Sequence, residues 1–198
     1  KALLVFEGTA ELPMAQMARA AVDEVESCTH LVVMTANPAG PSPVERALTL
    51  GQVMHTQPPV FPTHPSPPDD TAVILYTSGT TGRAKGAELT HANLLANAKV
   101  PHQLVGLGAE TVALVALPLF HAFGMTVMHN AVLAVGGTLV LLPRFSAGDA
   151  AALIARHRVT FFGGVPTMYV ALLHQEADLS TVTWCVSGGA PMPAEVMA

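Results

Sequence analysis

Residues 71–96 combine an apolar run, a glycine-rich loop and a helix-forming stretch, and this combination restricts the fold more than any other part of the chain. Residues 72–75 predict a strand, and the loop 76–86 holds four Ser or Thr residues, three glycines and two cations. Thr90 is the expected N-cap of a following helix. Strand, glycine-rich loop and helix together are typical of phosphate sites, because backbone N–H groups, hydroxyls and a lysine such as Lys85 converge on the anion. A solvated Ser/Thr/Gly loop is the plainer alternative, which the flanking elements disfavour.

Short apolar runs alternate with amphipathic stretches along the rest of the chain. Strands are expected at residues 2–6, 30–34, 71–76, 111–116, 138–142, 160–162 and 182–187, and helices at 11–26, 44–55, 90–104, 123–134, 147–157 and 167–174. The alternation predicts an α/β fold of mostly parallel sheets flanked by helices, with right-handed crossovers. We expect residues 1–198 to be part of a single domain. Six prolines between residues 56 and 70 indicate an extended connector, which is a candidate boundary between two sheet units.

Composition narrows the class of partner. Only 12% of the 198 residues are charged, against about 25% in an average protein. The net charge of −5 and the lack of a Lys/Arg run argue against a nucleic-acid partner. Cys28 and Cys185 stand in apolar sequence, so buried free thiols are expected rather than a disulfide, which suits a cytoplasmic protein.

Residues 111–143 carry no charge and are numerous enough to span a bilayer. The stretch also contains Pro118, His121 and the pair Gly136-Gly137. These residues favour a buried strand, loop, helix and strand over a membrane span. We therefore expect no transmembrane segment.

The glycine-rich loop does not fit a Walker motif, because Ala84 precedes Lys85 and Gly86 follows it. It resembles the signature of the adenylate-forming (acyl-CoA synthetase / AMP-binding) enzymes, roughly (S/T)SGTTGxPKG, and departs at Ala84, where that family usually has proline. Three further stretches resemble family motifs in family order: LPLFHAFG at 117–124, GGVPTMY at 163–169 and SGGAP at 187–191. The resemblance covers this whole chain, which corresponds to the central part of the family's N-terminal domain, with the C-terminal domain absent.

The resemblance implies ATP-dependent activation of a carboxylic acid to an acyl-adenylate, followed by thioester formation with coenzyme A. ATP, Mg²⁺ and coenzyme A are the implied cofactors. A fatty acid is the expected substrate, because the apolar stretches at 117–124 and 163–169 are most similar to those of fatty-acid and aryl-acid ligases. The alternatives are an acyl-AMP ligase that loads a carrier protein and a non-catalytic nucleotide-binding fragment. By itself this chain is expected to be inactive and, with so few charges on its apolar surface, to self-associate.

Site residues follow from the resemblance. The segment Thr77, Ser78, Gly79, Thr80, Thr81, Gly82 and Lys85 is implied to hold the β- and γ-phosphates of ATP, and Gly188, Gly189, Ala190 and Pro191 to lie along adenine. Arg144 is implied to meet the phosphates of coenzyme A, although a solvated arginine is nearly as well supported. The implied acid pocket is formed by His121, Phe123, Gly124 and Met125.

His121 and Lys85 are the expected catalytic residues. Judged by composition alone, a histidine between apolar residues is more often a core residue than a ligand. The implied role of His121 is to hydrogen bond or gate the carboxylate, since a carboxylate nucleophile is already ionised at neutral pH. No metal ligands are expected among the chain's own residues.

Overall fold

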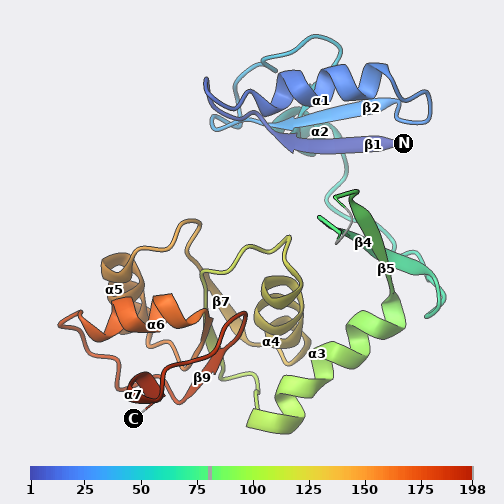
Figure 1. The fold of residues 1–198 in the computed structure, drawn as a ribbon. Helices are drawn as coiled ribbons and strands as arrows, with labels where there is room; N and C mark the ends of the chain where they lie inside the picture. The colour runs from blue at the N-terminus through green and yellow to red at the C-terminus, as the bar shows by residue number, and fades with distance from the viewer. Residues whose placement is uncertain (80–81, 198) are drawn as a thin grey trace. The chain divides into compact units, whose positions relative to one another are not determined.

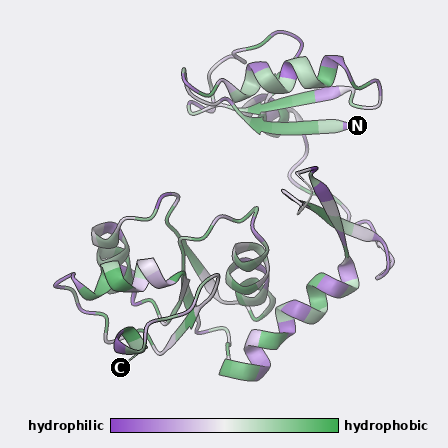
Figure 2. Ribbon diagram, viewed as in Figure 1, coloured by the Kyte–Doolittle hydropathy of each residue, from purple (hydrophilic) through white to green (hydrophobic). Residues whose placement is uncertain are grey.

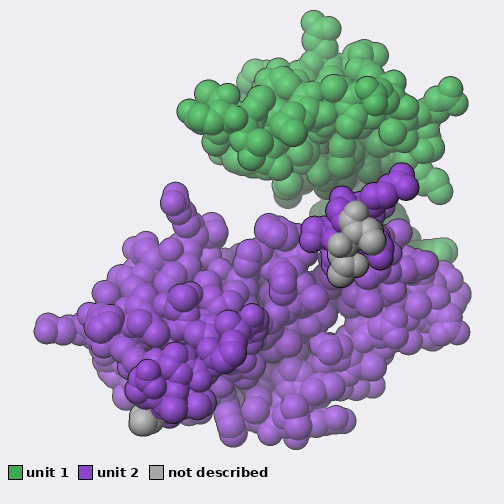
Figure 3. Space-filling view, viewed as in Figure 1, with its two compact units in different colours: residues 1–64 green, residues 65–198 purple. Residues whose placement is uncertain are grey.

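The computed structural model describes residues 1–79 and 82–197, and the chain divides into two compact units, Lys1–His64 and Pro65–Ala198 (Figures 1 and 3). The division falls inside the proline-rich segment, where residues 58–67 form neither helix nor strand. Cys28 and Cys185 are both free thiols, as expected. Cys28 is partly buried, but Cys185 is exposed on an edge strand, so its predicted burial is wrong.

The first unit is a three-stranded parallel sheet in the order β1-β2-β3 with two helices. Its strands are β1 (Ala2–Phe6), β2 (His30–Met34) and β3 (Leu48–Thr49), and its helices are α1 (Met14–Asp23) and α2 (Leu50–Thr56). Small and apolar residues of α1 pack on alternate residues of β1 and β2, which gives a core of Ala15, Ala18, Val22, Leu31 and Val33. Figure 2 shows β1 and β2 in the apolar colour.

Two boundaries in this unit differ from expectation. The helix expected at 11–26 begins only after Pro13, whose ring fixes the entry into the first turn. The helix expected at 44–55 begins at Leu50, because Thr49 caps it through a reciprocal capping box with Gln52. The preceding Leu48 pairs with Val32 as a short strand that the sequence did not predict.

The second unit opens with a β-hairpin, and here the predicted succession of strand, loop and helix is wrong. The strands β4 (Thr71–Thr77) and β5 (Lys85–Thr90) pair antiparallel, so that Thr77 lies opposite Lys85. The glycine-rich loop therefore joins two strands and does not lead directly into a helix. Helix α3 (His91–Val105) begins one strand later, and its expected N-cap Thr90 is confirmed.

A four-stranded parallel sheet in the order β7-β6-β8-β9 forms the rest of the second unit. Its strands are β6 (Val112–Val115), β7 (Thr138–Leu141), β8 (Phe161–Gly164) and β9 (Trp184–Ser187). The π-helix η1 (Gly124–Asn130) and α4 (Ala131–Ala134) cover one face, α5 (Ala147–His157) and α6 (Pro166–Leu173) cover the other, and α7 (Ala194–Met197) follows β9 (Figure 1). The predicted α/β class with mostly parallel sheets is confirmed.

The uncharged stretch 111–143 forms β6, η1, α4 and β7, which confirms the predicted strand, loop, helix and strand. Met128 and Val132 on the helical part are buried against Ala113, Val115 and Phe161 of the sheet. Within residues 1–79 and 82–197, no helix has both the length and the apolar character needed to cross a membrane.

Candidate functional site

The parallel sheet of the second unit has a topological switch point between β6 and β8. The chain leaves β6 toward η1 and α4 on one face, and leaves the neighbouring strand β8 toward α6 on the other face. The carboxyl ends of two such strands open a crevice, which is where α/β proteins bind ligands. The predicted segments 117–124 and 163–169 follow or end these two strands, and residues 187–191 end and follow the next strand, β9.

The three segments meet at this edge of the sheet. A Cβ added to Gly188 would lie 3.2 Å from Cε1 of Phe123, and one added to Gly189 would lie 3.6 Å from Cγ1 of Val165. The Gly188 N–H also donates to the carbonyl oxygen of Gly164 over 3.2 Å. The implied adenine segment thus lies beside Phe123 of the implied acid pocket. Gly164 and Val165 are the third segment at this edge. They were not predicted as site residues, although they belong to the GGVPTMY motif that the sequence analysis identified.

His121 occupies an exposed turn between β6 and η1. Its backbone N–H donates to Pro118, and its carbonyl accepts the N–H of Met125 at 2.9 Å. The ring Nδ1 accepts the N–H of Phe123 over 3.2 Å, so in the neutral ring the hydrogen is on Nε2. The exposed ring therefore offers an N–H donor suited to a carboxylate oxygen.

Gly124 and Met125 have different surroundings from Phe123. A Cβ on the buried Gly124 would collide with the carbonyl of Pro118, so this glycine permits a close backbone approach and has a packing role. Met125 lines a cavity of about 240 Å³ with Val73, Leu94, Leu119, His129 and Asn130. Phe123 belongs instead to the core cluster beneath η1. The structure therefore does not gather the implied acid-pocket residues into one cavity.

Of the implied phosphate residues that the structure describes, Thr77 ends β4 and Lys85 begins β5, and Ser78, Gly79 and Gly82 belong to the hairpin tip between these strands. Gly79 has φ of 66°, and a Cβ there would collide with the carbonyl of Arg83, so the tight turn requires glycine. The same position lies 3.6 Å from Cγ of Lys85, which places the start of that side chain against the turn. Thr80 and Thr81 lie outside the described residues. Across the part of the chain that the structure describes, no hydrogen bond or ion pair joins this tip to residues 117–125 or 188–191.

Arg144 and the end of the adenine segment are less constrained. Arg144 is exposed after β7, two strand spacings or about 10 Å from β8, and makes no side-chain hydrogen bond with another described residue. Ala190 and Pro191 are exposed beyond Gly189. Among residues 1–79 and 82–197, no cluster of three His, Cys, Asp or Glu side chains could hold a metal ion.

Comparison with known proteins assigns the chain to a family. The family model described as "AMP-binding enzyme" matches residues 1–198. The chain is similar to a long-chain-fatty-acid–CoA ligase of Bacillus subtilis (strain 168), with 42% identity over 137 residues, which cover 66% of this chain and 24% of that ligase. It is also similar to a feruloyl-CoA synthase of an Amycolatopsis species, with 42% identity over 132 residues, 65% of this chain and 27% of that synthase.

The fold is similar to that of ATP-bound MatB from Rhodopseudomonas palustris, with a TM-score of 0.78 and 31% identity over 99% of this chain and 36% of MatB. The chain spans about a quarter of the length of the curated relatives it matches. These matches are a CoA ligase and a CoA synthase among the curated relatives, and a protein with bound ATP among the solved structures. Over all of residues 1–198, the chain belongs to the family of AMP-binding enzymes.

Proposed function

We propose that the protein containing this chain activates a carboxylic acid with ATP and then transfers the acyl group to coenzyme A. The carboxylate oxygen attacks the α-phosphorus, the bond from that phosphorus to the bridging oxygen breaks, and pyrophosphate leaves. The thiol sulfur then attacks the acyl carbon and AMP leaves. Mg²⁺ enters this scheme with the nucleotide. The proposal includes a cytoplasmic location, where ATP and coenzyme A are both available.

The convergence at the switch point carries the proposal. The Phe123 ring lies 3.2 Å from where a Cβ of Gly188 would be, and the exposed His121 precedes Phe123 by two residues. A carboxylate held by Nε2 of His121 would therefore lie beside the segment proposed to hold adenine. Positioning of the two reactants and neutralisation of charge are what such a reaction asks of a protein, since the nucleophile needs no activation.

In this proposal, the glycine-rich loop supplies the positive charge that neutralises the phosphates of ATP. Lys85 and the hydroxyls of Thr77 and Ser78 would contact the β- and γ-phosphates from the hairpin tip, with Arg144 reserved for the coenzyme A phosphates. Because no hydrogen bond or ion pair joins the described tip to the switch point, we propose that nucleotide bridges the two.

An apolar acid is the proposed substrate, with a fatty acid as first candidate because a fatty-acid–CoA ligase is among the relatives. An aryl acid is the second candidate substrate, because a feruloyl-CoA synthase is also among the relatives. Apolar side chains dominate the surroundings of both Phe123 and Met125, although His129 and Asn130 add polar groups beside Met125.

ATP–pyrophosphate exchange by the full-length natural protein, measured over a panel of acids, tests the proposal. Each added methylene that becomes buried contributes about 0.8 kcal/mol, so KM should fall about fourfold per methylene until the pocket is full. Preference for acetate or amino acids would contradict an apolar pocket. Transfer of the acyl group to a carrier protein but not to coenzyme A would favour the acyl-AMP ligase alternative, and absence of exchange with every acid would favour a non-catalytic module.

A further inference from the structure

Tyr169 is the last residue of the GGVPTMY stretch and has no role in the proposed chemistry. It lies on α6, which begins at Pro166 directly after β8. Its half-buried ring packs edge-on against Phe162, with centroids 5.2 Å apart and planes at 61°. This contact holds the ring above β8 with its hydroxyl directed at the sheet.

The Tyr169 hydroxyl connects two strands. It lies 3.0 Å from the carbonyl oxygen of Phe162 on β8 and 2.9 Å from that of Val186 on β9, and it donates its hydrogen between them. Burial raises the pKa of Tyr169 above its ordinary value, so the hydroxyl remains a donor throughout the neutral range. A side chain from α6 thus fixes the spacing of β8 and β9 at their carboxyl ends.

This end of the sheet needs such a tie. Among the described strands, β9 is an edge strand with β8 as its neighbour. The strand ladder ends at the pair Gly164 and Ser187, and just beyond it the Gly188 N–H donates to the Gly164 carbonyl oxygen over 3.2 Å. Gly188 leaves little room beside the Phe123 ring, because a Cβ added there would lie only 3.2 Å from Cε1, so a shift of a few tenths of an ångström alters this packing.

We propose that Tyr169 is a positioning residue that sets where the segment 187–191 lies against Phe123. The inference rests on the proposed function, because that function gives the segment its adenine ligand. Tyr169 touches neither reacting group in this scheme. It acts through Val186, two residues before Gly188, and its loss should weaken ATP binding more than it slows the chemical step.

The test is Tyr169→Phe in the full-length natural protein, which keeps the ring and removes the hydroxyl. The matched control is Thr183→Val, because the Thr183 hydroxyl donates to the Thr160 carbonyl over 3.0 Å at the opposite end of the same strand pair. Each variant removes one hydroxyl that donates to a backbone carbonyl of this strand pair: Tyr169→Phe loses the contacts with Phe162 and Val186, and Thr183→Val loses the contact with Thr160. Only Tyr169→Phe removes a hydroxyl beside the proposed adenine segment.

Hydrogen exchange gives the first readout. Tyr169→Phe should speed exchange of the Gly188 amide about fivefold, the effect of one neutral hydrogen bond, whereas Thr183→Val should leave that amide unchanged. In ATP–pyrophosphate exchange, Tyr169→Phe should raise the KM for ATP about fivefold with kcat within about twofold of wild type, and Thr183→Val should change neither.

Equal Gly188 exchange in Tyr169→Phe and wild type would overturn the proposal, as would an equal KM increase in the control. If the wild-type protein shows no ATP–pyrophosphate exchange with any acid, the proposed function fails. Hydrogen exchange then still decides whether Tyr169 positions the segment.

Discussion

Lys85 gains its candidate role from its position as the first residue of β5, opposite Thr77 and against the Gly79 turn. Lys85→Ala in the full-length protein should cost about 1.5–3 kcal/mol in adenylation, the value of a hydrogen bond to a charged group. ATP–pyrophosphate exchange measures the loss as a change in kcat/KM. Lys99→Ala on exposed helix α3 is the control and should be neutral. Unchanged exchange in Lys85→Ala would remove the hairpin tip from the proposed site.

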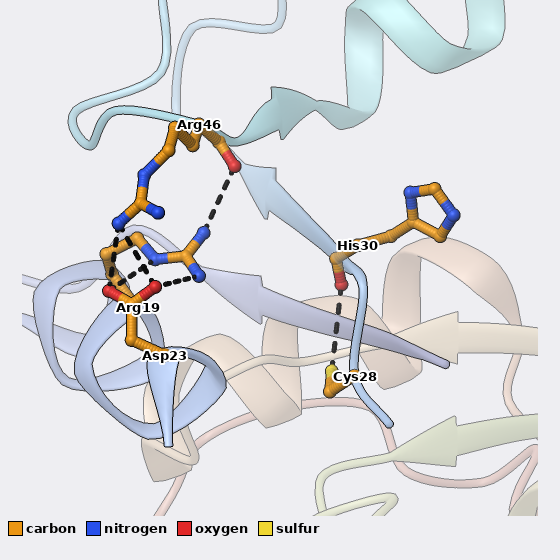
Figure 4. Close-up of polar contacts among 5 residues, drawn as sticks. All are labelled: Arg19, Asp23, Cys28, His30 and Arg46. Carbon is orange, nitrogen blue, oxygen red and sulfur yellow. Dashed lines mark hydrogen bonds and ion pairs between the residues drawn. The ribbon is translucent and has the colours of Figure 1, made fainter. Parts of the chain in front are cut away.

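Asp23 in the first unit accepts hydrogen bonds from two arginines (Figure 4). Arg19 lies 2.8 Å from its carboxylate and Arg46 lies 3.1 Å from it, and Arg19 also donates to the carbonyl of Arg46. The hydrogen bond from Arg19 is the main cause that lowers the pKa of Asp23. The carboxylate therefore stabilises the fold above its unfolded pKa near 4, and this stabilisation is lost as pH falls through the lower folded value.

Asp23→Asn should remove that part of the pH dependence. The change in urea midpoint between pH 7 and pH 3 should be smaller in Asp23→Asn than in wild type, by a modest amount because the pair is exposed. The control variant is Glu24→Gln at the exposed neighbouring residue. It should show the same change in urea midpoint between pH 7 and pH 3 as wild type. If this change in urea midpoint were the same in Asp23→Asn and wild type, the two arginines would contribute nothing to the pH dependence of stability.

Single elements could be predicted from the sequence where their causes are local. The N-cap at Thr90 was predictable, because a capping box depends on four consecutive residues. Strand β5 was not, because its hydrogen bonds go to β4 across a loop whose composition suits a hairpin as well as a phosphate turn. A helix was predicted at 123–134, but its π-helical part η1 was not. The wider turn at 124–130 leaves no signal in an apolar stretch that also suits an α-helix.

The site shows the same division. The positions of His121 and Phe123 after β6 followed from the pattern of apolar runs. The position of Phe123 beside Gly188 depends on strand order, because β6 and β9 are separated by β8 in space and by β7 and β8 in sequence. No local signal encodes that order, so only the motif resemblance pointed to it.

The capping box on α3 gives a prediction at the scale of an element. Thr90 Oγ1 accepts a hydrogen bond from the Asn93 N–H over 3.2 Å, and Oδ1 of Asn93 accepts one from the Thr90 N–H over 3.0 Å. Thr90→Ala should lower the free energy of unfolding by about 0.5–2 kcal/mol, as measured by urea denaturation. Thr90→Ser keeps the oxygen and should remain near wild type. Equal losses in both variants would assign the effect to the methyl group instead of the cap.

For the molecule as a whole, the described parts of the proposed site meet through apolar side chains, since Val73 of β4 lines one cavity with Leu119 and Met125. The hairpin tip and the switch point share no hydrogen bond or ion pair among the residues that the structure describes. Large apolar side chains are also exposed, for example Ile74 at 54%, Tyr76 at 75% and Trp184 at 46%. The first two lie on a two-stranded hairpin and the third on an edge strand, where unpaired backbone groups favour association.

The isolated 198-residue chain should therefore bind ATP weakly at most, self-associate and form no detectable acyl-adenylate. Catalysis of this kind needs donors fixed around the charge that develops at the α-phosphorus, and no hydrogen bond or ion pair among the described residues fixes the two segments to each other. Incubating the purified chain with ATP, Mg²⁺ and a fatty acid, then assaying pyrophosphate and the AMP ester, measures activity, and light scattering measures association. Turnover near 1–10³ per second, the ordinary range for enzymes, would show that these residues suffice for catalysis. A monodisperse monomer would show that the exposed apolar residues do not drive association.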